Sequence, residues 1–339
     1  MAKTGIRAVG LLSGGLDSTL AARLMLDQGI EVHAVNFHSP FCLCTAKRAG
    51  CAAAVTAVRE LGGIPLKRMA LGEDYLDMVR QPRHGYGRGM NPCIDCRIMK
   101  LKKAAEHMRE IGAAFLFTGE VLGQRPMSQH RRALDLIDRD TGLRGLILRP
   151  LSAAHLEPTV PEQEGWVDRT KLLDIAGRSR KRQMALAAEA GIHEFACPAG
   201  GCLLTDENFA ERLRDHLRHV DRVSWKDVAL LKVGRHRRLA NGDKVIVARN
   251  EEECRSLRNL AGEDDHVLTP DFPGPVVVLQ GDDVTAAMES VRTYTTKPIP
   301  EQATIRHEHR GLCEQLPAPA NVPGVTCGTG ENEGENVRS

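Results

Sequence analysis

The stretch VGLLSGGLDSTLAARLM, residues 9–25, places an apolar run, a serine with two glycines, and a helical pattern in direct succession. The apolar run is typical of a buried strand, and the last part is typical of a helix. Glycines between a strand and a helix let backbone N–H groups approach an anion, and the helix N-terminus adds partial positive charge. Ser13, Gly14 and Gly15 therefore predict a phosphate-binding turn.

The first 120 residues repeat this alternation of strand and helix. Strands are predicted at residues 6–12, 31–37, 64–71 and 113–119, with helices near 18–28, 45–61 and 94–111. Such alternation indicates an α/β fold with a doubly wound parallel sheet, which binds ligands at the carboxyl ends of its strands. A further strand within 143–152 precedes a Pro- and Glu-rich connector, so we assign residues 1–165 to one domain.

The rest of the chain changes character twice. Residues 166–222 form a segment with helices expected at 170–190 and 206–219. A small α/β domain follows at 223–296. Its strands are expected at 228–234, 243–249 and 275–281, its helices at 251–261 and 282–293, and a hairpin turn at Asn241 and Gly242. Residues 297–339 contain few apolar side chains and are predicted to be a flexible tail.

Composition narrows the class of protein. Hydrophobic residues at 42% and charged residues at 27% are ordinary for a globular chain, and a net charge of +2 allows an acidic polymer as partner without requiring one. No apolar run reaches the roughly 20 residues that span a bilayer. We expect a cytoplasmic protein that does not bind membranes. In a cytosolic chain of 339 residues, ten cysteines indicate metal binding or catalysis.

The cysteines fall into groups. Cys93 and Cys96 form a C-x-x-C pair at the start of a predicted helix, and Cys197 and Cys202 lie about a hundred residues later. Four thiols could bind zinc or an iron–sulfur cluster, and Cys96 or Cys202 could instead be a reactive thiolate or carry a persulfide. There are two alternatives. A rival metal site could instead consist of Cys42, Cys44 and Cys51, or the cysteines could be buried separately and have no common function.

SGGLDS, residues 13–18, resembles the pyrophosphate loop of the ATP pyrophosphatase (PP-loop) superfamily, whose members adenylate a substrate with ATP. The resemblance implies that the loop holds pyrophosphate and that Asp17 helps to hold Mg²⁺, a hard ion that prefers carboxylate oxygens. The alternative is that Ser13 and Asp17 only cap the helix. The residues implied in nucleotide binding are Ser13, Gly14, Gly15, Asp17, Ser18, Phe37 and Gly119.

Three further segments narrow the resemblance. NPCIDCRIMKLKKA (91–104) and GGCLLTDENFAERLRDHL (200–217) are similar to the two cysteine segments of tRNA 2-thiouridylases, whereas TGEVLGQRPMSQ (118–129) resembles tRNA 4-thiouridine synthetases. Asp17, Cys96 and Cys202 then take the catalytic positions. Arg97 departs from the 2-thiouridylase pattern, and the additional Cys93 is similar to iron–sulfur-dependent thiolases. This implies a [4Fe-4S] cluster, with zinc as the alternative, held by Cys93, Cys96 and either Cys197 or Cys202.

Two basic segments could contact RNA phosphates. They contribute Arg178, Arg180, Lys181 and Arg182, and Arg235, Arg237 and Arg238. The second lies in a segment, 230–257, that resembles the RNA-binding NFACT-R type of domain. The expected partners are tRNA and a sulfur donor, either sulfide or a persulfide-carrying protein, and a homodimer is left open.

Together these patterns predict an ATP-dependent tRNA sulfurtransferase that adenylates a uridine carbonyl and replaces its oxygen with sulfur. Two alternatives remain. One is a PP-loop enzyme that adenylates a small molecule for sulfur or nitrogen transfer. The other is a non-catalytic RNA-binding iron–sulfur protein.

Overall fold

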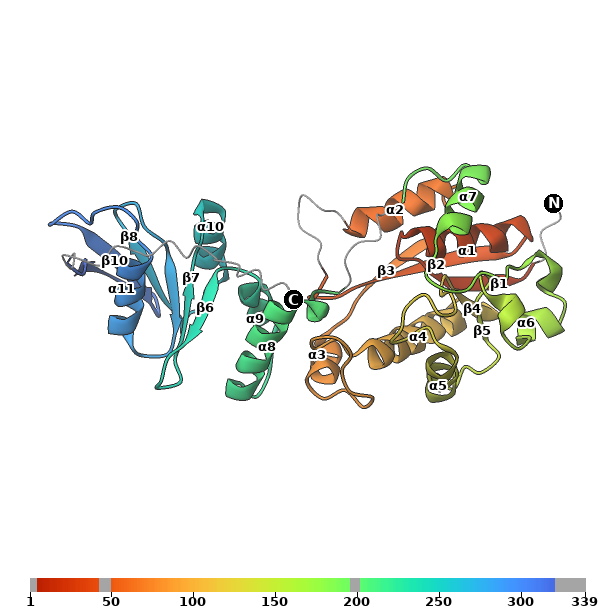
Figure 1. Ribbon diagram of the computed structural model, residues 1–339, viewed down its shortest axis with the longest axis horizontal. Coiled ribbons are helices and arrows are strands. Elements are labelled where there is room, and N and C mark those ends of the chain that lie inside the picture. Colours follow the sequence, from red (N-terminus) through yellow and green to blue (C-terminus); the bar gives the residue numbers. More distant parts are fainter. Residues whose placement is uncertain (1–4, 43–49, 196–201, 321–339) are drawn as a thin grey trace, which may run out of the picture. The chain divides into compact units, whose positions relative to one another are not determined.

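The computed structural model describes residues 5–42, 50–195 and 202–320, and it divides the chain into two units, Met1–Ser224 and Trp225–Ser339. Each unit has its own sheet (Figure 1). Among the described residues, no helix combines the length and apolar character needed to cross a bilayer.

The first unit is built around a five-stranded parallel sheet with the strand order β3-β2-β1-β4-β5. The predicted doubly wound α/β fold is confirmed. Its strands are β1 (Arg7–Leu11), β2 (Glu31–His38), β3 (Leu66–Ala70), β4 (Phe115–Thr118) and β5 (Ile147–Leu148). Its α-helices are α1 (Leu16–Asp27), α2 (Gly50–Glu60), α3 (Glu73–Arg80), α4 (Cys93–Glu110), α5 (Arg131–Thr141), α6 (Val160–Gln163), α7 (Lys181–Glu189) and α8 (Glu207–His219).

Alternate side chains of the strands enter two hydrophobic cores, one on each face of the sheet. Ala8 and Phe117 pack toward α1, α2 and α7, whereas Val9 and Leu116 pack toward α4 and α5. Figure 1 shows these two groups of helices on opposite faces of the sheet. From β1 the chain first adds β2 and β3 on one side, and then β4 and β5 on the other side. The loops that follow β1 and β4 therefore run in opposite directions and leave a crevice, which is where such sheets bind ligands.

Three helices in this unit, α3, α5 and α6, were not predicted, with α6 lying in the stretch expected to be a connector, and one helix was predicted too long. Helices α3 and α5 are short and mostly polar, and each buries only three side chains. The helix expected at 170–190 extends only over α7, because residues 169–171 form a separate 3₁₀ turn, η2 (Arg169–Lys171).

The second unit is a six-stranded antiparallel sheet with the order β11-β10-β8-β9-β7-β6. Its strands are β6 (Arg235–Arg238), β7 (Lys244–Val247), β8 (His266–Pro270), β9 (Val277–Gln280), β10 (Thr304–His309) and β11 (Leu312–Pro317). Its helices are α9 (Trp225–Leu231), α10 (Glu251–Leu260) and α11 (Val284–Thr293). The hairpin turn predicted at Asn241 and Gly242 joins β6 to β7, with Gly242 at φ +94°.

Two predictions for the second unit are wrong. The apolar run at 228–234 was expected to be a strand, but its first part belongs to α9, where Val228 and Leu231 are buried one turn apart. The flexible tail expected from residue 297 is wrong for β10 and β11, which pair with each other and extend the sheet beside β8. Ile305 is fully buried there, so a polar sequence is ordered by pairing with an existing strand.

Candidate functional site

The turn after β1 is closed by its own serines. The hydroxyls of Ser13 and Ser18 lie 3.1 Å apart, and the Ser13 hydroxyl accepts from the Gly15 N–H at 3.3 Å. Gly14 has φ +77°, and a Cβ there would lie 2.2 Å from the backbone of Ala53 in α2, so only glycine fits. Gly15 is the N-cap of α1, and no side chain caps this end. The N-cap position itself is therefore a glycine and not Ser13 or Asp17, and the positive end of α1 lies beside the turn.

Asp17 lies in the first turn of α1, and its two carboxylate oxygens differ in their contacts. Its Oδ2 accepts from the Gln124 side chain at 3.1 Å and lies 3.8 Å from a guanidinium nitrogen of Arg180. Its Oδ1 and the Nε of Arg180 are both buried and have no hydrogen-bond partner among the described residues. A buried carboxylate oxygen and a buried guanidinium nitrogen, both unpaired, suit a metal ion with its anionic ligand. Arg180, predicted for RNA contact, lies beside the turn.

Gly119 brings the end of β4 against the start of α1. A Cβ on Gly119 would lie 2.4 Å from the backbone nitrogen of Ser18 and 2.5 Å from the carbonyl carbon of Asp17. The predicted nucleotide-binding residue Gly119 therefore lies directly behind the turn. Phe37, also predicted to contact nucleotide, is half-buried at the end of β2 and packs against the core under α4.

This close approach gives a stability prediction. Gly119→Ala is expected to lower the free energy of unfolding by about 1–3 kcal/mol, because backbone must move to admit the methyl group. The matched control is Gly15→Ala, whose methyl would meet only the Ser13 hydroxyl at 3.4 Å, and which is expected to cost less than about 1 kcal/mol. Urea unfolding of both variants measures the difference. Equal stabilities would contradict the tight packing of Gly119 on α1.

A buried ionic network lies directly after Gly119. Glu120 is 2% exposed, and its two carboxylate oxygens each lie 3.0 Å from the Nε of an arginine, Arg97 in α4 and Arg149 after β5. Arg149, 4% exposed, also binds both carboxylate oxygens of Asp138. Burial alone would raise the pKa of Glu120, but Arg97 and Arg149 outweigh it and hold that pKa below its usual range. The network ties the first turn of α4 to the end of β4.

Glu120→Gln is expected to destabilise the first unit by about 3–5 kcal/mol at pH 7, because Arg149 would stay buried with less charge compensation. Since the folded-state pKa is lowered, this contribution is complete above the unfolded value of about 4.3 and is lost as the pH falls through the folded value. The difference in the free energy of unfolding between wild type and Glu120→Gln, measured with urea, should therefore become smaller from pH 7 to pH 3. Glu110→Gln, which removes an exposed partner of Lys67, is the control and should change stability little. A Glu120 variant as stable as wild type at pH 7 would contradict this role.

The two cysteine segments meet in the folded chain. Cys93 and Cys96 occupy the first turn of α4, and Cys202 precedes the 3₁₀ turn η3 (Leu203–Thr205). The backbone N–H of Leu203 donates to the carbonyl of Phe41 after β2, and the carbonyl of Leu204 accepts from Met90 in the loop before Cys93. All three thiols are free and half-buried. Residues far apart in sequence are thus held together at the carboxyl edge of the sheet.

The thiols of this region affect one another's pKa values. Burial raises the pKa of Cys202 to about 12, and the neighbouring thiols Cys96 and Cys42 add to that effect. Burial and then Cys96 raise the pKa of Cys93, opposed by Arg125 and Arg97. Arg97, the residue after Cys96, lies 3.0 Å from Glu120, and Gly119, the residue before Glu120, packs against Asp17 and Ser18, so the thiols of α4 and the turn lie at one edge of the sheet.

The thiols of Cys93, Cys96 and Cys202 are suitable ligands for a soft metal, but the described residues do not form a complete metal site. Thiolates suit zinc and iron–sulfur clusters, yet no three His, Cys, Asp or Glu side chains within the described part of the chain are arranged to hold a metal ion. Cys197 lies outside the described residues, as do Cys44 and the side chain of Cys51 from the rival site. Cys42, the described member of that rival group, lies near Cys202.

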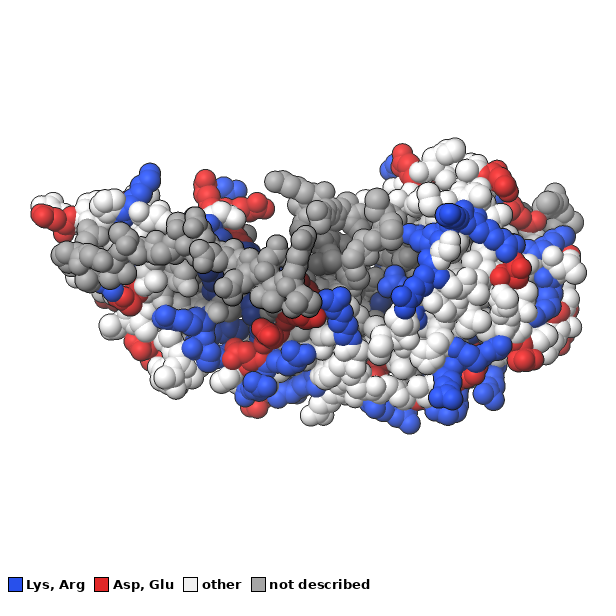
Figure 2. Space-filling model, in the orientation of Figure 1, with Lys and Arg blue, Asp and Glu red and all other residues white. Residues whose placement is uncertain are grey.

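The remaining basic residues lie on the surface of each unit. Arg178 and Lys181 are exposed, and Arg182 binds Asp174. In the second unit, Arg235 lies over the ring of Tyr294, and β6 also contributes Arg237 and Arg238. Figure 2 shows Lys and Arg side chains gathered in several patches on the visible face, including one near α7.

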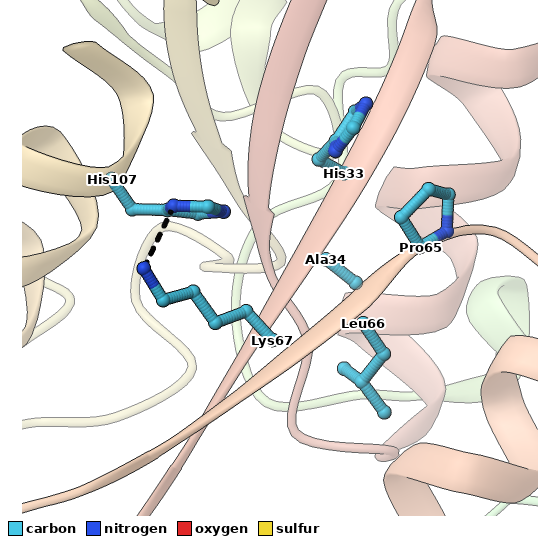
Figure 3. Close-up of a pocket in the computed structure, with 6 residues that line it drawn as sticks. All are labelled: His33, Ala34, Pro65, Leu66, Lys67 and His107. Atoms are coloured by element: carbon cyan, nitrogen blue, oxygen red, sulfur yellow. Dashed lines mark hydrogen bonds between the residues drawn. The ribbon is translucent and has the colours of Figure 1, made fainter. Parts of the chain in front are cut away.

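A small cavity lies away from this edge. It is lined by His33, Lys67 and His107 together with apolar side chains, and the Lys67 ammonium lies 3.1 Å from the Nδ1 of His107 (Figure 3). His33 and Lys67 belong to the first halves of β2 and β3, whereas the turn follows the last residue of β1. The cavity is therefore not part of the candidate site.

Comparisons with known proteins match each unit separately. Residues 3–160 match the family model of a thiamine biosynthesis protein (ThiI), and residues 234–315 match the NFACT protein RNA binding domain. Among curated relatives, the tRNA-specific 2-thiouridylase MnmA of Dichelobacter nodosus is 26% identical over 62% of this chain and 55% of its own length. That of Desulforamulus reducens is 22% identical over 94% and 92%. The chain thus spans little more than half of the first of these relatives.

The solved structures that match part of this chain include a 4-thiouridine synthetase and a tRNA thiolase. A 4-thiouridine synthetase in complex with RNA and ATP has a TM-score of 0.38 at 23% identity, covering 68% of this chain and 53% of its own. The U34-tRNA thiolase NcsA of Methanococcus maripaludis, with its [4Fe-4S] cluster, has a TM-score of 0.34 at 20% identity, covering 64% and 67%. The matches to the two family models and to the thiouridylases confirm the resemblances predicted from the sequence.

Proposed function

We propose that this chain, which joins a PP-loop domain of the tRNA thiouridine synthase type to a C-terminal NFACT-R-like domain, is an ATP-dependent tRNA sulfurtransferase. The observation that carries the proposal is one sheet edge that holds both a glycine turn, with the unpaired Oδ1 of Asp17, and thiols from two remote segments. The names of its thiouridylase relatives support tRNA as the substrate.

The chemistry explains why a nucleotide turn and thiols belong together. A uracil carbonyl oxygen is a poor leaving group, so it first attacks the α-phosphorus of ATP and pyrophosphate leaves into the turn. The N–H groups at the start of α1 and the guanidinium of Arg180 would stabilise the negative charge that develops there. Mg²⁺ held by Asp17 would supply further charge compensation.

Sulfur then replaces AMP. The terminal sulfur of a Cys202 persulfide attacks the activated carbon, and the bond to the AMP oxygen breaks, with AMP taking the electron pair. The Cys96 thiolate then attacks the inner sulfur, which forms a Cys96–Cys202 disulfide and leaves the thiocarbonyl on the base. A thiol reductant must open this disulfide before the next turnover.

A bound cluster is the second route to sulfur. Cys93 and Cys96, with Cys197 or Cys202, would hold a [4Fe-4S] cluster, or zinc in the alternative, and a cluster would supply sulfide as the nucleophile. Anaerobic purification followed by visible absorption and by iron, sulfide and zinc analysis of wild type and Cys93→Ala separates the routes. Finding neither metal nor sulfide would leave only the persulfide route.

The test of the function is incubation of the purified chain with ATP, Mg²⁺, unmodified tRNA and sulfide or a persulfide-carrying protein. We expect one pyrophosphate released for each thiouridine that nucleoside mass spectrometry detects. Pyrophosphate release on a metabolite without tRNA would instead favour the small-molecule enzyme. Binding of tRNA without pyrophosphate release would favour a non-catalytic RNA-binding protein.

A further inference from the structure

A buried tyrosine reaches the thiol site from a helix that the sequence patterns did not predict. Tyr75 lies in α3 and is 2% exposed. Its phenol donates a hydrogen bond to the sulfur of Cys96 at 3.6 Å. A buried hydroxyl without a partner is costly, and here the partner is the sulfur that the proposed reaction uses.

The ring of Tyr75 is held on its other sides. It packs against Phe41 at 6.2 Å between ring centroids, and Phe41 packs edge-on against Phe209 at 6.0 Å. Phe41 also accepts the backbone hydrogen bond from Leu203, next to Cys202. The tyrosine is therefore wedged between the segments that carry the two thiols, so its hydroxyl has little freedom to turn away from Cys96.

The phenol also belongs to a longer chain of hydrogen-bonding groups. Ser39 hydrogen-bonds to Tyr75, and the Ser39 hydroxyl lies 3.6 Å from the sulfur of Cys42. Ser39 also donates its backbone N–H to the Cys42 sulfur at 3.3 Å, so Tyr75 and Ser39 together link the segment after β2 to Cys96 in α4.

We propose that Tyr75 is a positioning residue, whose hydroxyl donates a hydrogen bond to the Cys96 sulfur and holds it in one orientation. The role in turnover rests on the proposed function of Cys96. The contact between the two side chains does not.

Tyr75→Phe removes the hydroxyl and keeps the ring. We expect alkylation of Cys96 by iodoacetamide at neutral pH, assigned by fragment-ion mass spectrometry of the full chain, to slow about three- to tenfold, the effect of losing one ordinary hydrogen bond to the sulfur. The kcat of tRNA thiolation should fall by a similar factor, with KM for ATP unchanged.

Tyr86→Phe is the matched control. It also loses one phenol hydroxyl, which donates to the backbone carbonyls of Val79 and Arg80 and not to a thiol. Its Cys96 alkylation and thiolation kcat should stay at the wild-type level. Equal alkylation rates and equal kcat in Tyr75→Phe, Tyr86→Phe and wild type would overturn the proposal. If wild type forms no thiouridine, the proposed function fails, while the alkylation rates still decide the role of Tyr75.

Discussion

Asp17→Asn is expected to lower tRNA-dependent pyrophosphate release by at least about a hundredfold, the scale of losing one charge-stabilising group in a transition state. The reason is the buried Oδ1, which has no hydrogen-bond partner in the described part of the chain and is the proposed ligand of Mg²⁺. An amide keeps the shape of the side chain but lacks the charge that Mg²⁺ and Arg180 would meet. The measurement is pyrophosphate release with saturating ATP, Mg²⁺ and tRNA.

Asp27→Asn is the control for this prediction. Asp27 ends the same helix and forms an exposed ion pair with Arg23, so its loss should leave both stability and pyrophosphate release close to wild type. Thermal unfolding of both variants shows whether α1 is intact. If Asp17→Asn is folded and releases pyrophosphate at a rate similar to wild type, Asp17 does not hold the metal ion.

Cys202→Ser is expected to separate the two halves of the reaction. Thiouridine formation should fall by at least about a hundredfold, as for removal of a nucleophile, because serine cannot carry a persulfide and is a poor ligand for a cluster. Pyrophosphate release should largely persist, since the turn after β1 does not contain this residue. Parallel assays of pyrophosphate and of thiouridine by nucleoside mass spectrometry measure both steps in one reaction.

Cys254→Ser is the control variant for Cys202→Ser. Cys254 is also a free, half-buried thiol, but it lies in α10 of the second unit, where its sulfur accepts from the Val276 N–H at 3.5 Å. This variant should keep both activities. Thiouridine formation at the wild-type rate by Cys202→Ser would show that sulfur reaches the base without Cys202, and the second cysteine segment would lose its proposed role.

Several features of the molecule follow from short stretches of sequence. The strand, turn and helix at residues 9–25 are predictable because a contiguous motif and a local hydrophobic period specify them together. The same is true of the parallel sheet, whose strands are apolar runs separated by helical patterns. Short apolar runs are ambiguous, and the stretch at 228–234 was assigned to the wrong element for that reason.

Other features depend on neighbours that are distant in sequence. The basic segment at 178–182 predicted that Arg180 contacts RNA. A run of charges does not show which of its side chains points toward the protein, so the position of Arg180 beside Asp17 could not be predicted. A lone tyrosine such as Tyr75 reads as a core residue until its hydroxyl is found beside Cys96. Strands β10 and β11 are polar and become ordered by pairing beside β8.

The doubly wound sheet and the glycine turn after β1 can be predicted from local patterns, because a few adjacent residues specify each of them. Three contacts become visible in the folded chain: Arg180 lies 3.8 Å from Asp17, Arg97 pairs with Glu120, and Tyr75 donates to Cys96. The physical reason is that a hydrogen bond or ion pair depends on distance and direction in space, and residues far apart in the chain acquire these only when the sheet edge brings them together.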